Sequence, residues 1–237
     1  MTDLTAIADP LRARRGERRP FIVGITGAVA VGKSTFAGEL AAAIAAWPGA
    51  PVVEVIATDG FLFPNAMLEA RALLNRKGFP ETYDGETLRA VLAAIRQGAA
   101  QIPVYSHTRY DIDPALTRRL DRPGALIVEG LGLQEGAAAL GLDALIYLDA
   151  DEADVAAWFE ARFIGLWRAA ETDPTSFYAR FRHMNETETR AFAGQVWRAI
   201  NLPNLKQHIA PARDIADFVV RKGPDHSMLS VSERVMG

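Results

Sequence analysis

The sequence contains no cysteine and no long hydrophobic run. Without cysteine the chain forms no disulfide, thiolate metal site or cysteine nucleophile, and a reducing cytoplasm is the simplest location for it. No segment approaches the ~18 consecutive apolar residues of a membrane-spanning helix. Residues 1–20 are rich in arginine but lack the apolar core of a signal peptide. We therefore expect a cytoplasmic protein with no membrane partner, beginning with a solvated helix.

Lysine is scarce, and the net charge is small. The formal charge is −3, which gives no support for a nucleic-acid partner. With 49% hydrophobic residues, the 237-residue chain can bury a full core without staples. We expect residues 1–237 to form one α/β domain. Only four of the 26 basic residues are lysine: Lys33, Lys77, Lys206 and Lys222.

Short apolar runs alternate with amphipathic segments along the chain. The runs predict buried strands; they cover residues 21–25, 52–57, 125–129, 144–148 and 216–220. The amphipathic segments predict helices; one begins at Lys33, and the others cover residues 85–96 and 151–168. Alternating strands and helices predict a central, mostly parallel sheet flanked by helices.

Residues 169–190 differ from the rest of the chain. They are rich in Thr, Glu and Arg and poor in aliphatic side chains. This composition fits a mobile helical lid over a site, or an ordinary solvated hairpin, and the sequence alone leaves both open.

A phosphate-binding motif follows the first predicted strand. Residues 27–34 match G-x-x-x-x-G-K-[ST] in full. Glycines at both ends let consecutive N–H groups converge on phosphate oxygens, the lysine adds a positive charge, and the serine offers a hydroxyl to Mg²⁺. The predicted nucleotide cradle comprises Gly27, Ala28, Val29, Ala30, Val31, Gly32, Lys33 and Ser34.

Two acidic residues end other predicted strands. Asp59 follows the second strand, and Glu129 ends the third. In an open α/β sheet these ends line the ligand crevice. Either carboxylate can hold Mg²⁺, and either can accept a proton from an attacking hydroxyl. Asp59 is the stronger candidate base, because apolar residues 61–63 follow it and suggest a walled pocket.

The guanine-reading motif N-K-x-D is absent, which favours a small-molecule kinase over a GTP-binding switch. Several narrower segments then occur in a familiar order. They are residues 58–61 (TDGF), 77–84 (KGFPETYD), 104–107 (VYSH), 110–111 (YD), 128–131 (VEGL) and 200–207 (INLPNLKQ). Over about residues 20–230 the chain resembles the type I prokaryotic pantothenate kinases, a P-loop kinase family.

The resemblance implies ATP- and Mg²⁺-dependent phosphorylation of the primary hydroxyl of pantothenate, and a homodimer. It implies that Asp59 is the base, that Lys33 and Arg162 act at the transferred phosphate, and that Ser34 and Glu129 hold Mg²⁺. Thr35 and His226 would complete the nucleotide site, with His226 stacking on adenine. The implied acceptor site comprises Asp59, Tyr105, His107, Tyr110, Phe159, Arg162 and Asn201.

Three features depart from the family pattern. Only about twenty residues precede the first strand, where the family usually has more. Phe159 stands where the family has tyrosine, and Glu171 stands where an aromatic residue is expected. An acid beside a pantothenate carboxylate would weaken binding. Another small alcohol (a nucleoside, a sugar or glycerate) is therefore an alternative acceptor, and a non-catalytic nucleotide-binding regulator is an alternative of another class.

Overall fold

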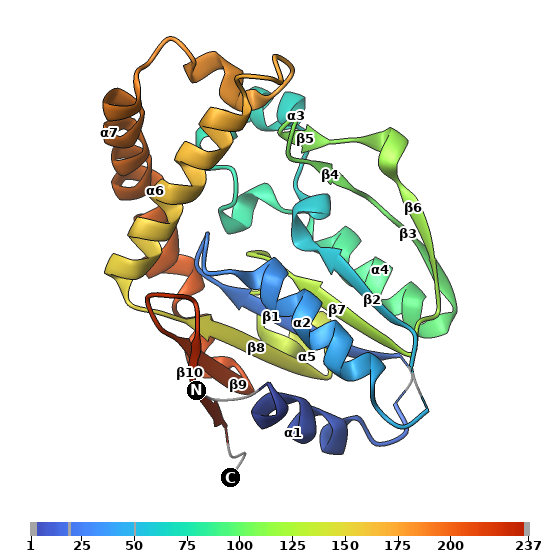
Figure 1. The fold of residues 1–237 in the computed structure, drawn as a ribbon. Coiled ribbons are helices and arrows are strands. Elements are labelled where there is room, and N and C mark those ends of the chain that lie inside the picture. Colours follow the sequence, from blue (N-terminus) through green and yellow to red (C-terminus); the bar gives the residue numbers. More distant parts are fainter. Residues whose placement is uncertain (1–3, 19, 50, 235–237) are drawn as a thin grey trace.

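The computed structural model describes residues 4–18, 20–49 and 51–234. Its centre is a sheet with the strand order β10-β9-β8-β1-β7-β2 (Figure 1). Neighbouring strands run parallel except for the pair of β9 and β10, which is antiparallel. The fold is therefore the predicted α/β arrangement. The strands are β1 (Phe21–Gly27), β2 (Val53–Ala57), β7 (Ala125–Glu129), β8 (Ala144–Asp149), β9 (Phe218–Lys222) and β10 (Met228–Glu233).

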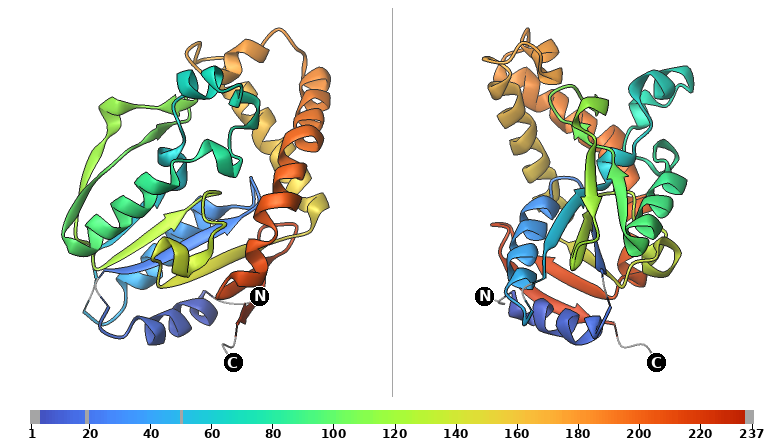
Figure 2. Two further views of the ribbon diagram at one scale, coloured as in Figure 1. Left: turned by 180° about the vertical axis from the view of Figure 1, so that it is seen from behind. Right: turned by 90° about the vertical axis from the view of Figure 1, so that its right-hand side faces the viewer.

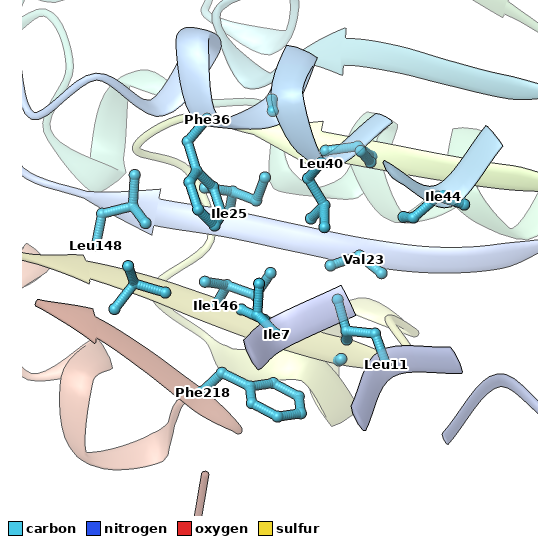
Figure 3. Packing of buried hydrophobic residues seen from close by; sticks show 14 of the residues in the cluster. Ile7, Leu11, Val23, Ile25, Phe36, Leu40, Ile44, Ile146, Leu148 and Phe218 are labelled. Atoms are coloured by element: carbon cyan, nitrogen blue, oxygen red, sulfur yellow. The ribbon is translucent and has the colours of Figure 1, made fainter. Parts of the chain in front are cut away.

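Helices cover both faces of the sheet, and the central strands are therefore buried on both sides. In β1, Val23 and Ile25 face the layer of α1 (Thr5–Arg15) and α2 (Lys33–Ala45), as Figure 3 shows. Ile22 belongs to the opposite layer, with α4 (Gly85–Gln97) and α5 (Gly136–Leu140). A strand with two apolar faces reads as a continuous hydrophobic run, which is why β1, β7 and β8 were predictable.

Two projections extend beyond the strand ends (Figures 1 and 2). One contains α6 (Glu152–Ala169), the 3₁₀ turn η5 (Phe177–Phe181) and α7 (Glu186–Val196). The other is an extended ribbon in which β3 (Ala99–Ile102) pairs with β6 (Arg118–Asp121), and β4 (Tyr105–Ser106) pairs with β5 (Asp111–Ile112). The remaining helices are α3 (Asn65–Ala70), α8 (Leu202–Asn204) and α9 (Ala212–Ile215).

The first helix is not solvated as expected. In α1, Ile7 and Leu11 are fully buried, and Figure 3 shows them beside Ile146 and Phe218 of the sheet. An i, i+4 apolar pair places both side chains on one helix face, and this face covers the sheet beside α2. The arginine of this segment at position 19 lies outside the described residues. None of the helices within the described ranges combines the length and hydropathy that a membrane span requires.

Candidate active site

The phosphate-binding motif forms the turn between β1 and α2, at the end of the sheet where the parallel strands finish. Gly27 and Gly32 have φ angles of +144° and +87°, which a side chain would strain. Lys33 Nζ donates to the backbone oxygens of Gly27 (3.1 Å) and Ala28 (2.8 Å). The ammonium group thus lies inside the turn. Backbone N–H groups at a helix start favour an anion here.

Charged groups from three other elements act on Lys33. Burial lowers the pKa of Lys33 to about 8, while the charges of Glu129 and Asp59 oppose this shift and that of Arg162 adds to it. Each residue must lie near the lysine for its charge to act. The fold therefore gathers Lys33, Glu129, Asp59 and Arg162, four of the predicted site residues, from distant parts of the chain.

The two carboxylates at the strand ends have different partners. Glu129 lies at the end of β7, and its Oε1 accepts a hydrogen bond from Ser34 Oγ at 2.8 Å. Asp59 lies in the short turn η1 (Thr58–Phe61) after β2, and its Oδ1 accepts from Tyr83 Oη at 3.4 Å. Burial and the Asp59 charge raise the pKa of Tyr83, so Tyr83 stays a donor. Glu129 thus belongs to the phosphate turn, and Asp59 to the neighbouring space.

The ends of β2 and β7 are held against each other by a close contact. Thr58 is fully buried, and the backbone N–H of Gly132 donates to its Oγ1 at 3.4 Å. A Cβ atom added at Gly130, whose φ is +146°, would collide with Thr58 Oγ1. Only glycine fits at this position. The contact fixes the spacing between Asp59 and Glu129, the residues that follow and precede the touching pair.

The extended ribbon contributes a group of aromatic side chains. Tyr105 packs edge-on against His107 (5.2 Å between ring centroids) and Tyr110 (6.1 Å). Lys77 Nζ lies 4.8 Å and 4.4 Å from the Tyr105 and Tyr110 ring centroids. Burial, aided by the charge of Asp59, raises the pKa of Tyr110 to about 12. The predicted residues Tyr105, His107 and Tyr110 therefore meet in one cluster that Asp59 faces.

The projection of α6, η5 and α7 closes on this cluster. Phe177 of η5 stacks on Tyr110 with a centroid distance of 4.1 Å and an interplanar angle of 23°. The backbone N–H of Phe177 also donates to the oxygen of Thr108 at 3.1 Å. Residues 169–190 contain η5 and the start of α7, so this segment packs on the ribbon and is not only a solvated hairpin.

Arg162 of α6 is exposed and lies near Lys33 and Tyr178. Burial raises the pKa of Tyr178, and the charge of Arg162 opposes this rise. The sequence also allows Arg162 a simple ion pair on its own helix, with Glu160 or Asp154. Neither pair forms among the described residues, and Glu160 pairs with Arg190 at 2.7 Å. Its position fits a role at a transferred phosphate.

Phe159 and Asn201 come from two adjoining helical segments. Phe159 packs against Phe163 and Trp197, with centroid distances of 6.2 Å and 5.9 Å. Asn201 ends the π-helical segment η6 (Trp197–Asn201) and is partly buried. Phenylalanine can replace the tyrosine of the family at position 159 because neighbouring rings hold its side chain in place.

The environment of Glu171 does not support the predicted repulsion of a pantothenate carboxylate. Its side chain is 70% exposed and lies 3.6 Å from a guanidinium nitrogen of Arg182. A water-exposed carboxylate beside an arginine repels an anionic ligand little. Glu171 therefore gives no reason to exclude an acidic acceptor.

His226 lies on the other side of the phosphate turn. It stacks on Trp158 with a centroid distance of 3.9 Å, and its Nδ1 is 3.5 Å from where a Cβ of Gly32 would stand. Burial, aided by the charge of Lys222, lowers the pKa of His226. The imidazole is thus placed beside the nucleotide turn, as expected, but one of its faces already carries an indole ring.

Sequence reasoning assigned no role to Lys77, Tyr83 and Phe177. Lys77 and Tyr83 lie within the KGFPETYD segment, so a signal was present, but nothing in the segment shows which side chains turn inward. Phe177 lies in a polar stretch, and its stacking on Tyr110 depends on the packing of two distant elements. Fold geometry was needed to place all three.

The Ser34–Glu129 pair fits a magnesium site of the kind that phosphate-binding enzymes use. Mg²⁺ in such sites keeps several waters and takes one or two protein oxygens plus the substrate phosphates. A hydroxyl and a carboxylate at 2.8 Å meet that need. Elsewhere in the described ranges, no group of three or more acidic or histidine side chains is arranged to hold a metal alone.

Comparisons with known proteins agree with this geometry. The profile of the Phosphoribulokinase / Uridine kinase family matches residues 22–158. A pantothenate kinase of Sorangium cellulosum is 46% identical over 240 residues, covering 98% of this chain and 78% of that protein. A pantothenate kinase of Parvibaculum lavamentivorans is 41% identical over 242 residues, covering 97% and 74%.

Solved structures share the fold. A kinase of Silicibacter sp. TM1040, named for a fructose transport system, superposes with a TM-score of 0.70 at 25% identity, over 91% of this chain and 96% of that one. YFH7 of Saccharomyces cerevisiae superposes with a TM-score of 0.63 at 15% identity, over 94% and 100%. The second likeness concerns the fold alone.

Proposed function

Because this chain belongs to the phosphoribulokinase/uridine kinase family and, within it, to the pantothenate kinases, we propose that it transfers the γ-phosphoryl group of ATP to the primary hydroxyl of pantothenate. The chain is a phosphotransferase with an alcohol as acceptor, and a non-catalytic regulator is set aside. One observation carries the proposal: Asp59 follows β2 beside Glu129 of β7, which accepts from Ser34 of the phosphate turn, while the Asp59 carboxylate accepts from Tyr83 of the KGFPETYD segment. Asp59 therefore stands between the donor and acceptor sides.

The side chains divide the reaction between them. Asp59 accepts the proton of the attacking hydroxyl, and its bond from Tyr83 orients the carboxylate. Lys33 exchanges its two backbone hydrogen-bond partners for phosphate oxygens. Arg162 neutralises negative charge on the phosphoryl group during its transfer. In a loose transition state the proton leaves late, so the reaction does not require a strong base.

We further propose that Ser34 and Glu129 hold Mg²⁺. When bound there, the ion would offset the negative charge of the phosphates. Thr35, next to Ser34 at the start of α2, would add its N–H or hydroxyl to the same phosphates, and His226 would border the adenine.

We propose that the acceptor binds at the cluster of Tyr105, His107 and Tyr110, with Asn201 of η6 as a further contact. Phe159 lacks the hydroxyl of the tyrosine that the family has at this position. The loss of one hydrogen bond to the acceptor costs about 0.5–1.5 kcal/mol. Pantothenate binding survives such a loss. A sugar, nucleoside or glycerate remains the second candidate acceptor, which the name of the Silicibacter relative and Phe159 favour.

The experiment is a direct assay of the purified protein with Mg·ATP and pantothenate, which should yield phosphopantothenate. A parallel panel contains fructose, uridine and glycerate. Turnover of a panel member in place of pantothenate would replace the proposed acceptor. Nucleotide binding without turnover of any alcohol would contradict the proposed chemistry.

We also propose that the chain acts as one domain of residues 1–237 with a lid of about residues 169–190. A cytoplasmic homodimer without nucleic-acid or membrane partners completes the proposal. Light scattering on the purified protein should give about twice the chain mass of 25.8 kDa; a mass equal to one chain would reject the dimer.

A further inference from the structure

One buried amide connects the helix of Asn201 with the loop of Lys77. Asn204 is only 4% exposed, and its Nδ2 donates to the backbone oxygen of Gly78 at 2.9 Å, across 126 positions of sequence. Its Oδ1 is buried as well and has no hydrogen-bond partner among the residues that the structure describes. A buried amide with an unused acceptor costs stability. A side chain kept only for packing would more simply be apolar.

The helix around Asn204 departs from α-geometry on both sides. α8 lies between two π-helical segments, η6 (Trp197–Asn201) and η7 (Leu205–Ile209). π-Helical turns are rare and occur frequently at functional sites. Asn201 precedes Asn204 by three residues, so both side chains belong to one side of the helix. The irregular helix thus carries two amides three residues apart, and that of Asn204 reaches the turn at Gly78.

With the bond from Asn204, both backbone polar groups of Gly78 are hydrogen-bonded, which fixes the turn at this residue. The N–H of Gly78 donates to Thr82 Oγ1 at 3.0 Å, and its carbonyl oxygen accepts from Asn204. Thr82 is fully buried. Gly78 has a φ of +96°, a conformation that glycine adopts without strain. Lys77 directly precedes this turn, so the turn sets the direction in which the lysine leaves the backbone.

Lys77 then extends into the aromatic cluster. Its Nζ donates to Asn65 Oδ1 and to the backbone oxygen of Tyr110, both at 2.6 Å. The charged groups that act on it are Asp111 and Asp59, and burial lowers its pKa to about 8. The Tyr105 and Tyr110 rings flank the ammonium. A small shift of the backbone at Gly78 would move Lys77 out of this environment.

We propose that Asn204 is a positioning residue that fixes Lys77 relative to Asn201 across the acceptor pocket. Its part in acceptor binding rests on the proposed function, whereas its effect on Lys77 is a property of the fold. A second contact between the same segments, the edge-on packing of His208 against Phe79 at 5.7 Å, keeps them together when the hydrogen bond is removed. Variants of Asn204 are therefore expected to fold.

The first measurement follows Lys77 itself. With four lysines in the chain, protein labelled with ¹³C-lysine gives few Cε signals, and Lys77→Arg identifies the one of interest. In the wild type this signal should titrate near pH 8. In Asn204→Leu and Asn204→Asp the midpoint should move upward towards 10.5, because a loosened turn exposes the ammonium to water.

The matched control is Thr189→Val. Thr189 is a fully buried polar residue of α7 whose Oγ1 donates to the backbone oxygen of Asn185 at 2.8 Å, within the same projection. The valine removes the Thr189 hydroxyl and its one hydrogen bond, and it leaves both hydrogen bonds of Gly78 in place. The Lys77 midpoint should stay as in the wild type.

The second measurement is kinetic. Both Asn204 variants should raise the KM for the acceptor by about tenfold, the loss expected for one well-placed hydrogen bond, and leave the KM for ATP within about twofold. Folded Asn204 variants with the wild-type Lys77 midpoint and acceptor KM would overturn the inference. A wild type that phosphorylates no pantothenate would reject the proposed function instead, and the Lys77 titration would still decide the role of Asn204.

Discussion

At the scale of single residues, the two strand-end carboxylates are distinguished by their contacts. Asp59 receives a hydrogen bond from a tyrosine on the acceptor side, and Glu129 receives one from Ser34 in the phosphate turn. Position at a strand end left both roles open for each acid, and the family resemblance implied Asp59 as the base and Glu129 as a Mg²⁺ ligand. Their different partners turn this choice into two separable predictions.

Replacing Asp59 by asparagine should lower kcat by about 10²–10⁴-fold, the usual contribution of a general base. The KM for ATP should stay within about twofold, because the Asp59 carboxylate accepts its hydrogen bond from Tyr83 and not from a group of the phosphate turn. Steady-state kinetics with pantothenate measure both values. Tyr83→Phe is the companion variant and should cost less, since it only frees the carboxylate. An unchanged kcat in Asp59→Asn would remove the base from the mechanism.

Replacing Glu129 by glutamine should act on the metal. A neutral amide binds a hard cation more weakly than a carboxylate, so the Mg²⁺ concentration for half-maximal rate should rise by about tenfold or more. Titration of activity with Mg²⁺ at saturating ATP measures it. Asp59→Asn serves as the comparison and should leave the Mg²⁺ midpoint in place. An equal Mg²⁺ concentration for half-maximal rate in the wild type and Glu129→Gln would show that Glu129 does not bind the ion.

Sequence alone predicted the residues of the site that belong to fixed motifs. The phosphate turn, Asp59 and Glu129 follow from glycine spacing and strand ends, which local physics determines. Lys77, Tyr83 and Asn204 were visible as letters of narrow segments, but their roles depend on burial and on partners up to 126 positions away. Such contacts exist only after the chain has folded.

At the scale of elements, the segment of residues 169–190 packs on the ribbon through a ring pair and a backbone hydrogen bond. Phe177 of η5 stacks on Tyr110 of the ribbon, and Tyr110 itself has a positive φ of +55°. A non-glycine residue in this region is uncommon and stores some strain. The stack therefore links the position of η5 to the shape of the ribbon.

Removing the ring in Phe177→Ala should favour the open lid. An aromatic pair contributes about 0.5–1.5 kcal/mol beyond its buried area, so the acceptor KM should rise severalfold. Limited trypsin digestion should cut after Arg180 and Arg182 faster than in the wild type. The control is Leu116→Ala, an exposed ribbon residue outside the stack. Identical digestion of Phe177→Ala and the wild type would show that the stack does not hold the lid.

The elements that sequence missed are the short and polar ones. β7 and β8 are continuous apolar runs, and their predicted limits agree with the structure within a residue. β4 and β5 have two residues each, too few for a period to be read. β10 pairs at the sheet edge with an irregular register and a half-exposed pattern. The π-helical segments around α8 carry no composition signature at all.

At the scale of the whole molecule, buried ionisable groups set the response to alkaline pH. Burial lowers the pKa values of Lys33 and Lys77 from 10.5 to about 8. Between these values the unfolded chain binds more protons, so stability rises with pH. Burial raises the pKa values of Tyr110 and Tyr147 from 10.0 to about 12. Above pH 10 the folded chain binds more protons, and stability falls as pH rises.

We therefore expect the melting temperature without nucleotide to rise between about pH 8 and pH 9.5 and to fall above about pH 10. Thermal denaturation followed by circular dichroism measures the profile. Lys77→Met should flatten the rise, and Tyr147→Phe should flatten the fall. A melting temperature that decreases steadily from neutral pH would contradict the lysine part of this account.

The contact between Thr58 and Gly130 has a consequence for how this enzyme can diversify. Because only glycine fits against the threonine, position 130 cannot change while Thr58 is in place, and the spacing of Asp59 and Glu129 is inherited with this pair. The ring pair of Phe177 and Tyr110 between the two projections is under no such steric constraint, since other rings can stack there. Descendants of this chain can acquire a new acceptor through those two projections while the phosphoryl-transfer centre stays the same.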